Sequence, residues 1–426
     1  MRRYVLLLPG HDPTDMAYHH GRFVNQAGRF AELWGARTQV SALGEGGEAH
    51  AAQWSAATAG PNWRTETRYE ILRWDDIVRH LDARPDRVRL ARGFSALWDF
   101  LKAGAAWRYL RTNLRYGLFF FYPFACVALF LAAAGVAGWA GFRLAAPLLT
   151  ALPAALLGVA IAVAAFFVLF RWPGRRWHLH QALDDWDLAR DYLYGRAGAV
   201  EARIEALAER LVRRMREARE EGVDEVVLVG HSLGATFAVA LLCRALAIDP
   251  ALAQGPVRLR FLTCGATLPK LAFHPAGSRV REETARVAAM PGLLWAEFQA
   301  RHDAINFYKV HPVRLTMIAK GQDGWGPDRG SPVIRIVSFK QMLTPRKFRR
   351  IRWRMMRIHY QFLLANERRA NYDYFMFVLG PVPFDDLVIA RDGPLRRFAP
   401  DGALLPPPAP DGPANPPTHA LPTDPT

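Results

Sequence analysis

A serine stands inside a short, glycine-bounded motif that is typical of nucleophilic catalysis. Residues 230–234 read Gly-His-Ser-Leu-Gly and match the pattern Gly-X-Ser-X-Gly. A serine on a sharp turn has a strained backbone and an exposed hydroxyl, which can attack an acyl carbon. The glycines two residues before and two residues after it avoid clashes that larger side chains would cause. The motif therefore predicts Ser232 as the nucleophile of an acyl-transfer reaction.

The segments on either side of Ser232 have the patterns that such a turn requires. Residues 225–229 form an apolar run that predicts a buried strand, and residues 233–246, rich in Ala and Leu, predict a helix. A helix that begins directly after the serine points its first backbone amides at the hydroxyl. We therefore expect the amide of Leu233 to be one of two donors to the oxyanion of the tetrahedral intermediate.

Through this motif and the strand before it, the chain resembles the α/β-hydrolase superfamily, in its lipase- and esterase-like branch. The resemblance covers most of residues 1–390, apart from a long apolar segment in the middle. It implies a three-layer α/β fold and a catalytic triad in the chain order Ser, acid, His. The acid should follow a late strand, and the His should follow the last strand.

The acid that this order requires is Asp303. A strand predicted at residues 293–298 is followed by a loop, residues 299–307, in which Asp303 is the one carboxylate. The alternative role of Asp303 is that of a turn residue or of a cap on a following helix, which Asp often supplies. Asn306 resembles the segment after the acid in similar hydrolases, which favours the catalytic role.

The base that this order requires is His359. After the last predicted strand, residues 333–339, only His359 and His419 remain, and His419 lies in a Pro-rich tail. His231 neighbours the serine, but neighbours on a tight turn point apart, and His302 and His311 precede the last strand. A base in this position takes the serine proton and is held in the right tautomer by the acid. About twenty residues separate the strand from His359, which departs from the family pattern.

The second oxyanion donor should come from the loop after the first strand. That loop, Pro9-Gly10-His11-Asp12, resembles the His-Gly loop of the family without reproducing it. The backbone amides of His11 and Asp12 are the two candidates, and the sequence does not choose between them.

Two long uncharged segments lie in the middle of the chain. No charged residue occurs from 116 to 142 or from 144 to 170, and Arg143 alone separates the segments. About 20 apolar residues cross the hydrocarbon core as a helix, so each segment is long enough to span a bilayer. The alternative is a buried hairpin of a soluble protein, but such helices seldom run this long without a charge. We predict a two-helix transmembrane hairpin at residues 116–170.

Basic residues gather on the two outer flanks of this hairpin. Four precede it and three follow it: Lys102, Arg108, Arg111, Arg115, Arg171, Arg175 and Arg176. The positive-inside rule places both flanks, and with them both termini, in the cytoplasm, and we expect a bacterial inner membrane. Residues 1–115 and 171–398 then lie on one side of the membrane and form a single catalytic domain that the hairpin interrupts.

Outside the hairpin, short apolar runs alternate with helical patterns. Besides residues 225–229, strands are predicted at residues 4–8, 38–43, 67–74, 257–264, 293–298 and 333–339. Helices are predicted from a cap at Thr14 to about Trp34 and over residues 200–221. This alternation predicts a mostly parallel sheet with helices on both faces. Residues 399–426, dominated by Pro, Ala, Gly and Asp, are expected to be a disordered tail.

A basic stripe lies just before His359. It holds seven basic residues and no acidic one: Arg346, Lys347, Arg349, Arg350, Arg352, Arg354 and Arg357. Apolar residues recur among them at spacings of three and four, which predicts one basic amphipathic helix. Such a helix could contact anionic lipid beside the membrane. A surface helix with solvated arginines and a site for phosphate-bearing substrates are the alternatives.

The composition limits which partners and which cellular compartment are expected for this protein. The formal charge of +16 and the pI near 10.2 are compatible with nucleic acid, anionic lipid or acidic substrates. Nucleic acid is not expected, because the basic residues flank the apolar segments or form one short stripe. Three scattered cysteines, Cys126, Cys243 and Cys264, indicate neither a disulfide framework nor a zinc site and suit a reducing compartment.

Neither a cofactor nor a metal is expected. The glycines Gly44, Gly46 and Gly47 do not form a phosphate-binding loop. The histidines in His19-His20 and His178-Leu179-His180 do not complete a convincing ligand set for a metal ion. We expect a membrane-anchored serine hydrolase that cleaves an ester or thioester, with a lipid-like substrate as the natural guess. The alternatives are an acyltransferase with the same triad and a non-catalytic membrane interaction protein on a hydrolase scaffold.

Overall fold

The computed structural model describes residues 1–44, 50–314 and 331–407, and an eight-stranded sheet forms its centre. The strand order is β2-β3-β4-β1-β5-β6-β7-β8. The strands are β1 (Arg2–Leu8), β2 (Arg37–Val40), β3 (Ala51–Ala59), β4 (Arg64–Leu72), β5 (Glu225–His231), β6 (Arg258–Cys264), β7 (Leu294–Ala300) and β8 (Val333–Val337). The pairings from β4 to β8 are parallel, whereas β3 pairs antiparallel with β2 and β4. The predicted α/β class with a mostly parallel sheet is confirmed.

The antiparallel edge of the sheet differs from the prediction. Strand β3 was not predicted, because five of its nine residues are alanine and it lacks a run of β-branched side chains. In the folded protein, successive side chains of β3 alternate between buried and exposed positions: Trp54 and Ala56 are buried, and Ser55 between them is exposed. Strand β4 begins before the predicted residue 67, and β2 ends before the predicted residue 43.

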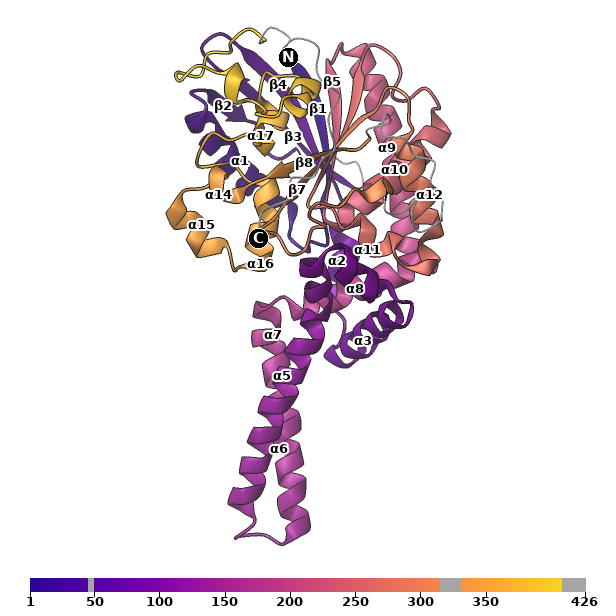
Figure 1. Cartoon of the computed structure of the whole chain (residues 1–426), viewed down its shortest axis with the longest axis vertical. Helices are drawn as coiled ribbons and strands as arrows, with labels where there is room; N and C mark the ends of the chain where they lie inside the picture. The colour runs from indigo at the N-terminus through magenta and orange to yellow at the C-terminus, as the bar shows by residue number, and fades with distance from the viewer. Residues whose placement is uncertain (45–49, 315–330, 408–426) are drawn as a thin grey trace.

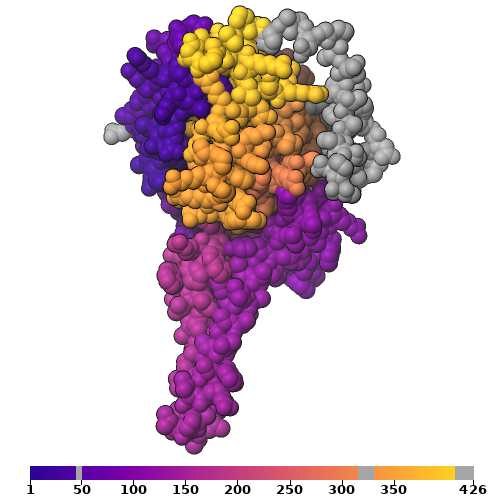
Figure 2. All heavy atoms as spheres, turned by 60° about the vertical axis from the view of Figure 1, so that its left-hand side comes forward, coloured from indigo at the N-terminus to yellow at the C-terminus, as the bar shows by residue number. Residues whose placement is uncertain are grey.

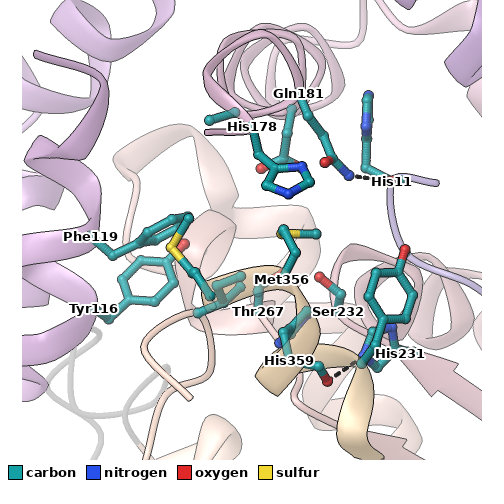
Figure 3. A pocket seen from close by; sticks show the side chains of 16 residues that line it. His11, Tyr116, Phe119, His178, Gln181, His231, Ser232, Thr267, Met356 and His359 are labelled. Atoms are coloured by element: carbon teal, nitrogen blue, oxygen red, sulfur yellow. Dashed lines mark hydrogen bonds between the residues drawn. The ribbon is translucent and has the colours of Figure 1, made fainter. Parts of the chain in front are cut away.

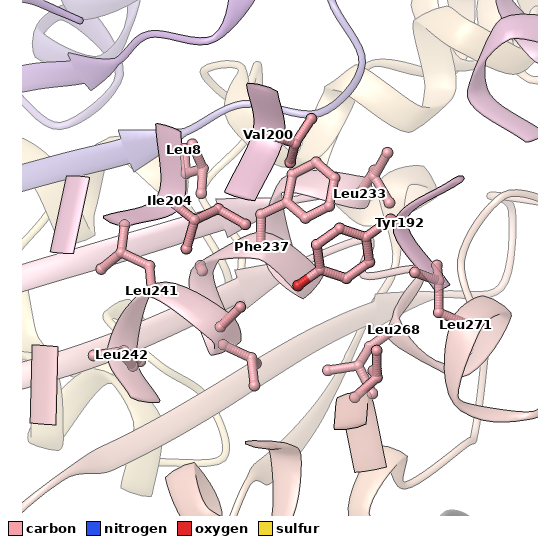
Figure 4. Packing of buried hydrophobic residues seen from close by; sticks show 14 of the residues in the cluster. Leu8, Tyr192, Val200, Ile204, Leu233, Phe237, Leu241, Leu242, Leu268 and Leu271 are labelled. Carbon is pink, nitrogen blue, oxygen red and sulfur yellow. The ribbon is translucent and has the colours of Figure 1, made fainter. Parts of the chain in front are cut away.

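Helices cover both faces of the sheet (Figure 1), and the side chains of β1 alternate between the two cores. Leu6 and Leu8 face a core that includes helices α9 (Gly198–Glu220) and α10 (Leu233–Ile248), part of which Figure 4 shows around Phe237. Val5 and Leu7 face a second core with α1 (Met16–Leu33) and α17 (Tyr374–Leu379). Because both faces are covered, β1 is apolar along most of its length.

The two parts of the chain that flank the apolar hairpin share this one sheet. Strand β1, from before the hairpin, pairs in parallel with β5, from after it. The other helices of the body are α2 (Asp75–Asp82), α3 (Asp86–Lys102), α4 (Ala105–Thr112), α7 (Pro173–Arg176), α8 (Leu179–Leu193), α11 (Leu268–Ala272), α12 (Ser278–Ala288), α14 (Phe339–Met342), α15 (Pro345–Ile351), α16 (Met355–His359) and α18 (Phe384–Ile389). In the part of the chain that the structure describes, three short 3-10 helices cover Pro275–Gly277, Tyr360–Leu363 and Leu395–Arg397.

Two long apolar helices, α5 (Leu114–Ala145) and α6 (Ala151–Arg171), leave the body side by side as a stalk (Figures 1 and 2). Both are long and apolar enough to cross a membrane. In the most apolar window of each helix, only 28% of the first and 11% of the second is buried. This exposure is unlike that of a central hairpin in a soluble protein, which would be covered on all sides.

Small residues let α5 and α6 approach each other closely. A Cβ atom on Gly138 would lie 2.6 Å from the carbonyl oxygen of Gly158. Close backbone approach through small residues is typical of helix pairs in membranes. The first turns of α5 have a second role, because Tyr116 and Phe120 are buried against the body. The hairpin is therefore anchored in the domain at its root and exposed beyond it.

The basic stripe forms two short helices instead of the single amphipathic helix predicted. Helix α15 ends at Ile351, residues 352–354 form a turn that interrupts the helix, and α16 runs from Met355 to His359. The apolar residues of the stripe, such as Phe348 and Ile358, pack into the body as the spacing indicated. The break carries no Gly or Pro, so no helix-breaking residue marks it in the sequence.

The tail begins later than predicted. Residues 399–405 contact the body, since the indole of Trp63 donates to the carbonyl of Gly402 (2.9 Å) and Asn62 donates to that of Leu404 (3.0 Å). The ordered contacts of the body therefore extend past residue 399, the predicted start of the tail. The remainder of the predicted tail, residues 408–426 with His419, and the glycines Gly46 and Gly47 lie outside the described residues.

Candidate active site

Ser232 lies on the turn between β5 and α10 in a conformation that few side chains adopt. Its backbone has φ 56° and ψ −128°. The turn is so tight that a Cβ atom on Gly230 would lie 2.6 Å from the Cα of Ala235, and one on Gly234 would lie 2.3 Å from the carbonyl oxygen of Pro9. Side chains at either glycine would displace backbone. Strained backbone at one polar side chain is a mark of functional sites.

His359 and Asp303, 56 residues apart in the chain, form a buried hydrogen bond. The imidazole Nδ1 lies 2.7 Å from Oδ2 of Asp303, and the two residues are 1% and 0% exposed. His359 is the last residue of α16, and Asp303 lies in the loop after β7. The other oxygen of Asp303 accepts from the backbone N–H of Ile305 at 2.9 Å. The carboxylate is thus fixed from both sides.

Asn306 holds the loop that carries Asp303. Its side-chain oxygen accepts from the N–H of Ala300 (3.0 Å), and its side-chain nitrogen donates to the carbonyls of Ala300 (2.9 Å) and Asp303 (2.7 Å). Asn306 is fully buried, so these bonds satisfy polar groups that water does not reach. In the sequence, Asn306 is of interest because it follows the predicted acid. In the structure, its side chain positions the backbone of Asp303.

Ser232 and His359 line one pocket, which Figure 3 shows from close by. When Nδ1 donates to Asp303, the lone pair of Nε2 is free to accept a proton. Among the described residues, Nε2 of His359 has no hydrogen-bond partner. The structure therefore forms the bond between Asp303 and His359 and places His359 in the pocket of Ser232, but no hydrogen bond joins His359 to Ser232. Such bonds are often long in free enzymes and tighten with substrate.

His231 supports the backbone of His359. Its Nε2 lies 3.3 Å from the carbonyl oxygen of His359, and the two rings are 4.6 Å apart between centroids. Burial, with a smaller effect of the neighbouring His359, holds the pKa of His231 well below its ordinary value. The neutral ring therefore donates from Nε2 to that carbonyl. Sequence reasoning set His231 aside as a neighbour that points elsewhere, and did not foresee this contact.

The loop after β1 folds over Ser232. A Cβ atom on Gly10 would lie 2.7 Å from the Cβ of Ser232. Gln181, on α8, donates to the carbonyl of His11 at 2.5 Å and so fixes that peptide (Figure 3). Leu233 is the first residue of α10, and its N–H therefore has no partner within the helix. The three candidate donors, the amides of Leu233, His11 and Asp12, thus belong to two segments that meet at the serine.

Tyr360, directly after His359, connects the segment of His359 to this loop through a hydrogen bond. Its hydroxyl donates to Oδ2 of Asp12 at 2.8 Å, while Oδ1 of Asp12 accepts from the N–H of Thr14 at 2.9 Å. Burial by itself raises the pKa of Asp12, but His19 and the hydrogen bonds from Thr14 and Tyr360 outweigh it and lower the pKa below its ordinary value. Asp12 is accordingly a carboxylate, and its side chain serves the loop. Sequence reasoning considered only its amide.

Several walls of the pocket come from elements that the sequence did not connect with the serine. Tyr116 and Phe119 belong to the root of α5, His178 and Gln181 to the start of α8, and Met356 to α16. The cavity is small, at about 50 Å³. Two of its walls are thus built from the apolar helix and the basic stripe. No spacing in the sequence relates these segments, because they meet only through the fold.

Comparison of the chain with family models, curated proteins and solved structures found no match in any of the three. Within residues 1–44, 50–314 and 331–407, no group of three or more His, Cys, Asp or Glu side chains could hold a metal ion.

Proposed function

We propose that this protein is a membrane-anchored serine hydrolase of the α/β-hydrolase type that cleaves an ester or thioester. The observation that carries the proposal is the buried 2.7 Å bond between Asp303 and His359, whose free imidazole nitrogen lies in the pocket of Ser232. Support comes also from the chain order, with the acid after β7 and the base after β8. The strained conformation of Ser232 on its strand-to-helix turn adds to it.

The proposed reaction proceeds through an acyl-enzyme. Nε2 of His359 takes the proton of Ser232 as its oxygen attacks the acyl carbon, and Asp303 stabilises the imidazolium. The amide of Leu233 and an amide of the loop at His11 and Asp12 stabilise the oxyanion. The imidazolium then gives its proton to the leaving alcohol or thiol. Water, activated by the same imidazole, releases the acyl group as an acid and restores Ser232.

The same proposal gives α5 and α6 the role of a membrane anchor. Both helices are long and apolar enough to cross a bilayer, and little of either is covered by protein. Arg115 precedes the apolar part of α5, and Arg175 and Arg176 follow α6, so the body would lie on the cytoplasmic side. The site would then stand directly above the membrane, because the root of α5 lines its pocket.

A fluorophosphonate probe tests the proposal on the detergent-solubilised full chain. The wild type should label, and Ser232→Ala should not label at all, because the probe reacts only with an activated serine. His359→Ala should label at least ~100-fold more slowly, since it lacks the base. Ser55→Ala, an exposed serine on β3, is the matched control and should label like the wild type.

Thermal unfolding of each variant establishes that loss of labelling is not loss of fold. A folded wild type that does not label would leave the fold as a non-catalytic scaffold and overturn the proposal. Normal labelling of His359→Ala would remove His359 from the site. An acyl transfer that requires an added alcohol or amine, and does not proceed with water alone, would identify an acyltransferase.

A further inference from the structure

A large groove runs from the apolar stalk to the catalytic pocket. It measures about 860 Å³, and its walls are α5 around Tyr122 to Leu129, the segment that follows α6, and the break between α15 and α16. The groove shares His178, Met355 and Met356 with the pocket of Ser232. The two hollows therefore adjoin at these three residues, and Leu129, on the exposed part of the stalk, lines the outer one. We call this hollow the lateral groove.

The apolar wall of the lateral groove belongs to α5, a hydrophobic helix that is long enough to cross a membrane. Leu129 is 55% exposed, and it lies within the most apolar part of α5. If α5 crosses the membrane, this wall opens toward the acyl chains of the leaflet on the side of the body. Exposed tryptophans stand around the root of the stalk, namely Trp172 at 80%, Trp177 at 40% and Trp353 at 83%. Indole rings prefer this interfacial depth.

The charged wall of the lateral groove consists of Arg176, Arg354 and Arg357, with no acidic residue among the residues that line it. Within the described residues none of the three forms an ion pair, although arginines elsewhere in the body do, such as Arg89 with Asp184 and Arg260 with Asp385. Arginine binds phosphate through several hydrogen bonds at once. Three such cations above an apolar wall are complementary to a phosphate headgroup that carries acyl chains.

We infer that the lateral groove binds a phospholipid with an anionic headgroup from the adjacent leaflet, and that this lipid is the substrate of the site. The inference rests on the proposed function. The acyl chains lie along α5, the phosphate lies against the three arginines, and the ester passes Met355 and Met356 to reach Ser232. The serine oxygen bonds to the acyl carbon as the ester C–O bond breaks, and His359 passes the proton to the leaving oxygen. Water then releases the fatty acid, so the products are a fatty acid and a lysolipid.

Methionine suits the passage between the groove and the pocket. Met355 and Met356 are the first two residues of α16, four and three residues before His359, and both line the groove as well as the pocket. An unbranched, flexible side chain can move aside for an acyl chain and close the passage again. A short soluble ester does not need this path, because it is not held in a bilayer.

The test uses the full chain in lipid nanodiscs made of phosphatidylglycerol or of phosphatidylcholine, with fatty acid release measured by mass spectrometry. The wild type should release fatty acid from the anionic lipid at least ~10-fold faster than from the zwitterionic one. Arg354→Glu with Arg357→Glu should lower phosphatidylglycerol turnover at least ~10-fold, expressed relative to the turnover of a short p-nitrophenyl ester by the same variant.

The matched control reverses two charges outside the groove. Arg349→Glu with Arg350→Glu changes exposed arginines of α15, in the same basic stripe, and should change that ratio by less than about two-fold. If the reversed pair at 354 and 357 fails to fold, Arg354→Gln with Arg357→Gln should lower the ratio by a smaller factor. Equal losses in both charge reversals would indicate general attraction to the surface and would overturn the groove assignment.

Failure of the inference is distinct from failure of the proposed function. A wild type that labels at Ser232 and cleaves the short ester, but releases no fatty acid or prefers neither lipid, overturns the inference and leaves the hydrolase in place. A wild type that neither labels nor cleaves any ester overturns the proposed function, and the inference falls with it.

Discussion

The proposed catalytic corner, formed by Ser232, His359 and Asp303, meets the lateral groove at Met355 and Met356, yet the two are built in opposite ways. In the catalytic corner, Asp303 and His359 are almost fully buried and their bonds are already formed. In the groove, Trp353 is 83% exposed and the arginines of the wall have no carboxylate partner among the described residues. Groups that move protons gain from a fixed geometry. Groups that recognise a ligand are left unpaired until the ligand arrives.

This contrast predicts that the smallest chemical change in the catalytic corner has the largest effect. Asp303→Asn keeps the size of the side chain but removes its charge and the acceptor that selects the tautomer of His359. We expect the ester turnover and the rate of probe labelling to fall by roughly 10³- to 10⁴-fold, as for a triad that loses its acid. The fold should persist, because the amide can still accept from the N–H of Ile305 at Oδ1.

Stopped-flow ester hydrolysis and timed probe labelling, with the unfolding temperature as a control for fold, measure this effect. A loss below about ten-fold would mean that the buried bond between Asp303 and His359 is structural. The corner would then be no more specialised than the groove, and the comparison between the two regions would fail.

The glycines of the turn provide a second way to test how tightly the catalytic corner is built. Gly234→Ala places a methyl group 2.3 Å from the carbonyl oxygen of Pro9 and 2.4 Å from that of Leu8, so two backbone segments must separate. We expect a loss of about 2–4 kcal/mol in the free energy of unfolding, by overpacking. Probe labelling should also slow, because the loop of the oxyanion donors moves away from Ser232.

Gly28→Ala is the matched control for this change. Gly28 lies in helix α1, and a Cβ atom there would meet nothing within 4 Å. Replacement should stabilise the protein by about 0.5–1 kcal/mol, since alanine favours the helix over glycine. Equal unfolding temperatures for the two variants would show that the turn can relax, and that its close contacts are not a constraint on the site.

The sequence predicts features that depend on neighbouring residues better than features that depend on contacts between distant segments. The turn at Ser232 is a local structure, and Gly230, Gly234 and the flanking apolar runs indicate it directly. Asp303 and His359 are predicted through chain order, which a resemblance supplies and local patterns do not, and the structure brings the two side chains together. Strand β3 was not predicted, because its alanines hide the alternation of buried and exposed positions. The break between α15 and α16 was not predicted, because no Gly or Pro marks it.

The walls of the site were beyond prediction for a different reason. Gln181 comes from a helix after the hairpin, Tyr360 directly follows His359, and Phe119 belongs to the stalk. Their roles depend on pairs of segments that lie far apart in the sequence, such as Tyr360 with Asp12, 348 residues away. One sequence carries no pattern that links two such positions, whereas packing of the folded chain places them together.

The link between Tyr360 and Asp12 gives the smallest effect and one that depends on pH. Tyr360→Phe removes a hydrogen bond to a buried carboxylate, which should cost about 1.5–3 kcal/mol near neutral pH. Burial opposes the ionised form of Asp12, but His19, Thr14 and Tyr360 keep its pKa below the ordinary value of 3.8. A lowered carboxyl pKa contributes stability above about pH 4, and this stability is lost as the pH falls through the lowered pKa.

Without the Tyr360 hydroxyl, the pKa of Asp12 should rise, so the variant gains less stability from ionisation than the wild type does. The gap in unfolding temperature between the two should therefore be widest near pH 7 and should narrow below about pH 4. Tyr18→Phe, which removes a hydroxyl from a residue that is 60% exposed, should shift the unfolding temperature little at any pH. A gap that stays the same on acidification would mean that Asp12 does not ionise through this range, as for a carboxyl that is already protonated at neutral pH. The loop over Ser232 would then be held by neutral bonds, and this side of the catalytic corner would be less firmly fixed than the side at Asp303.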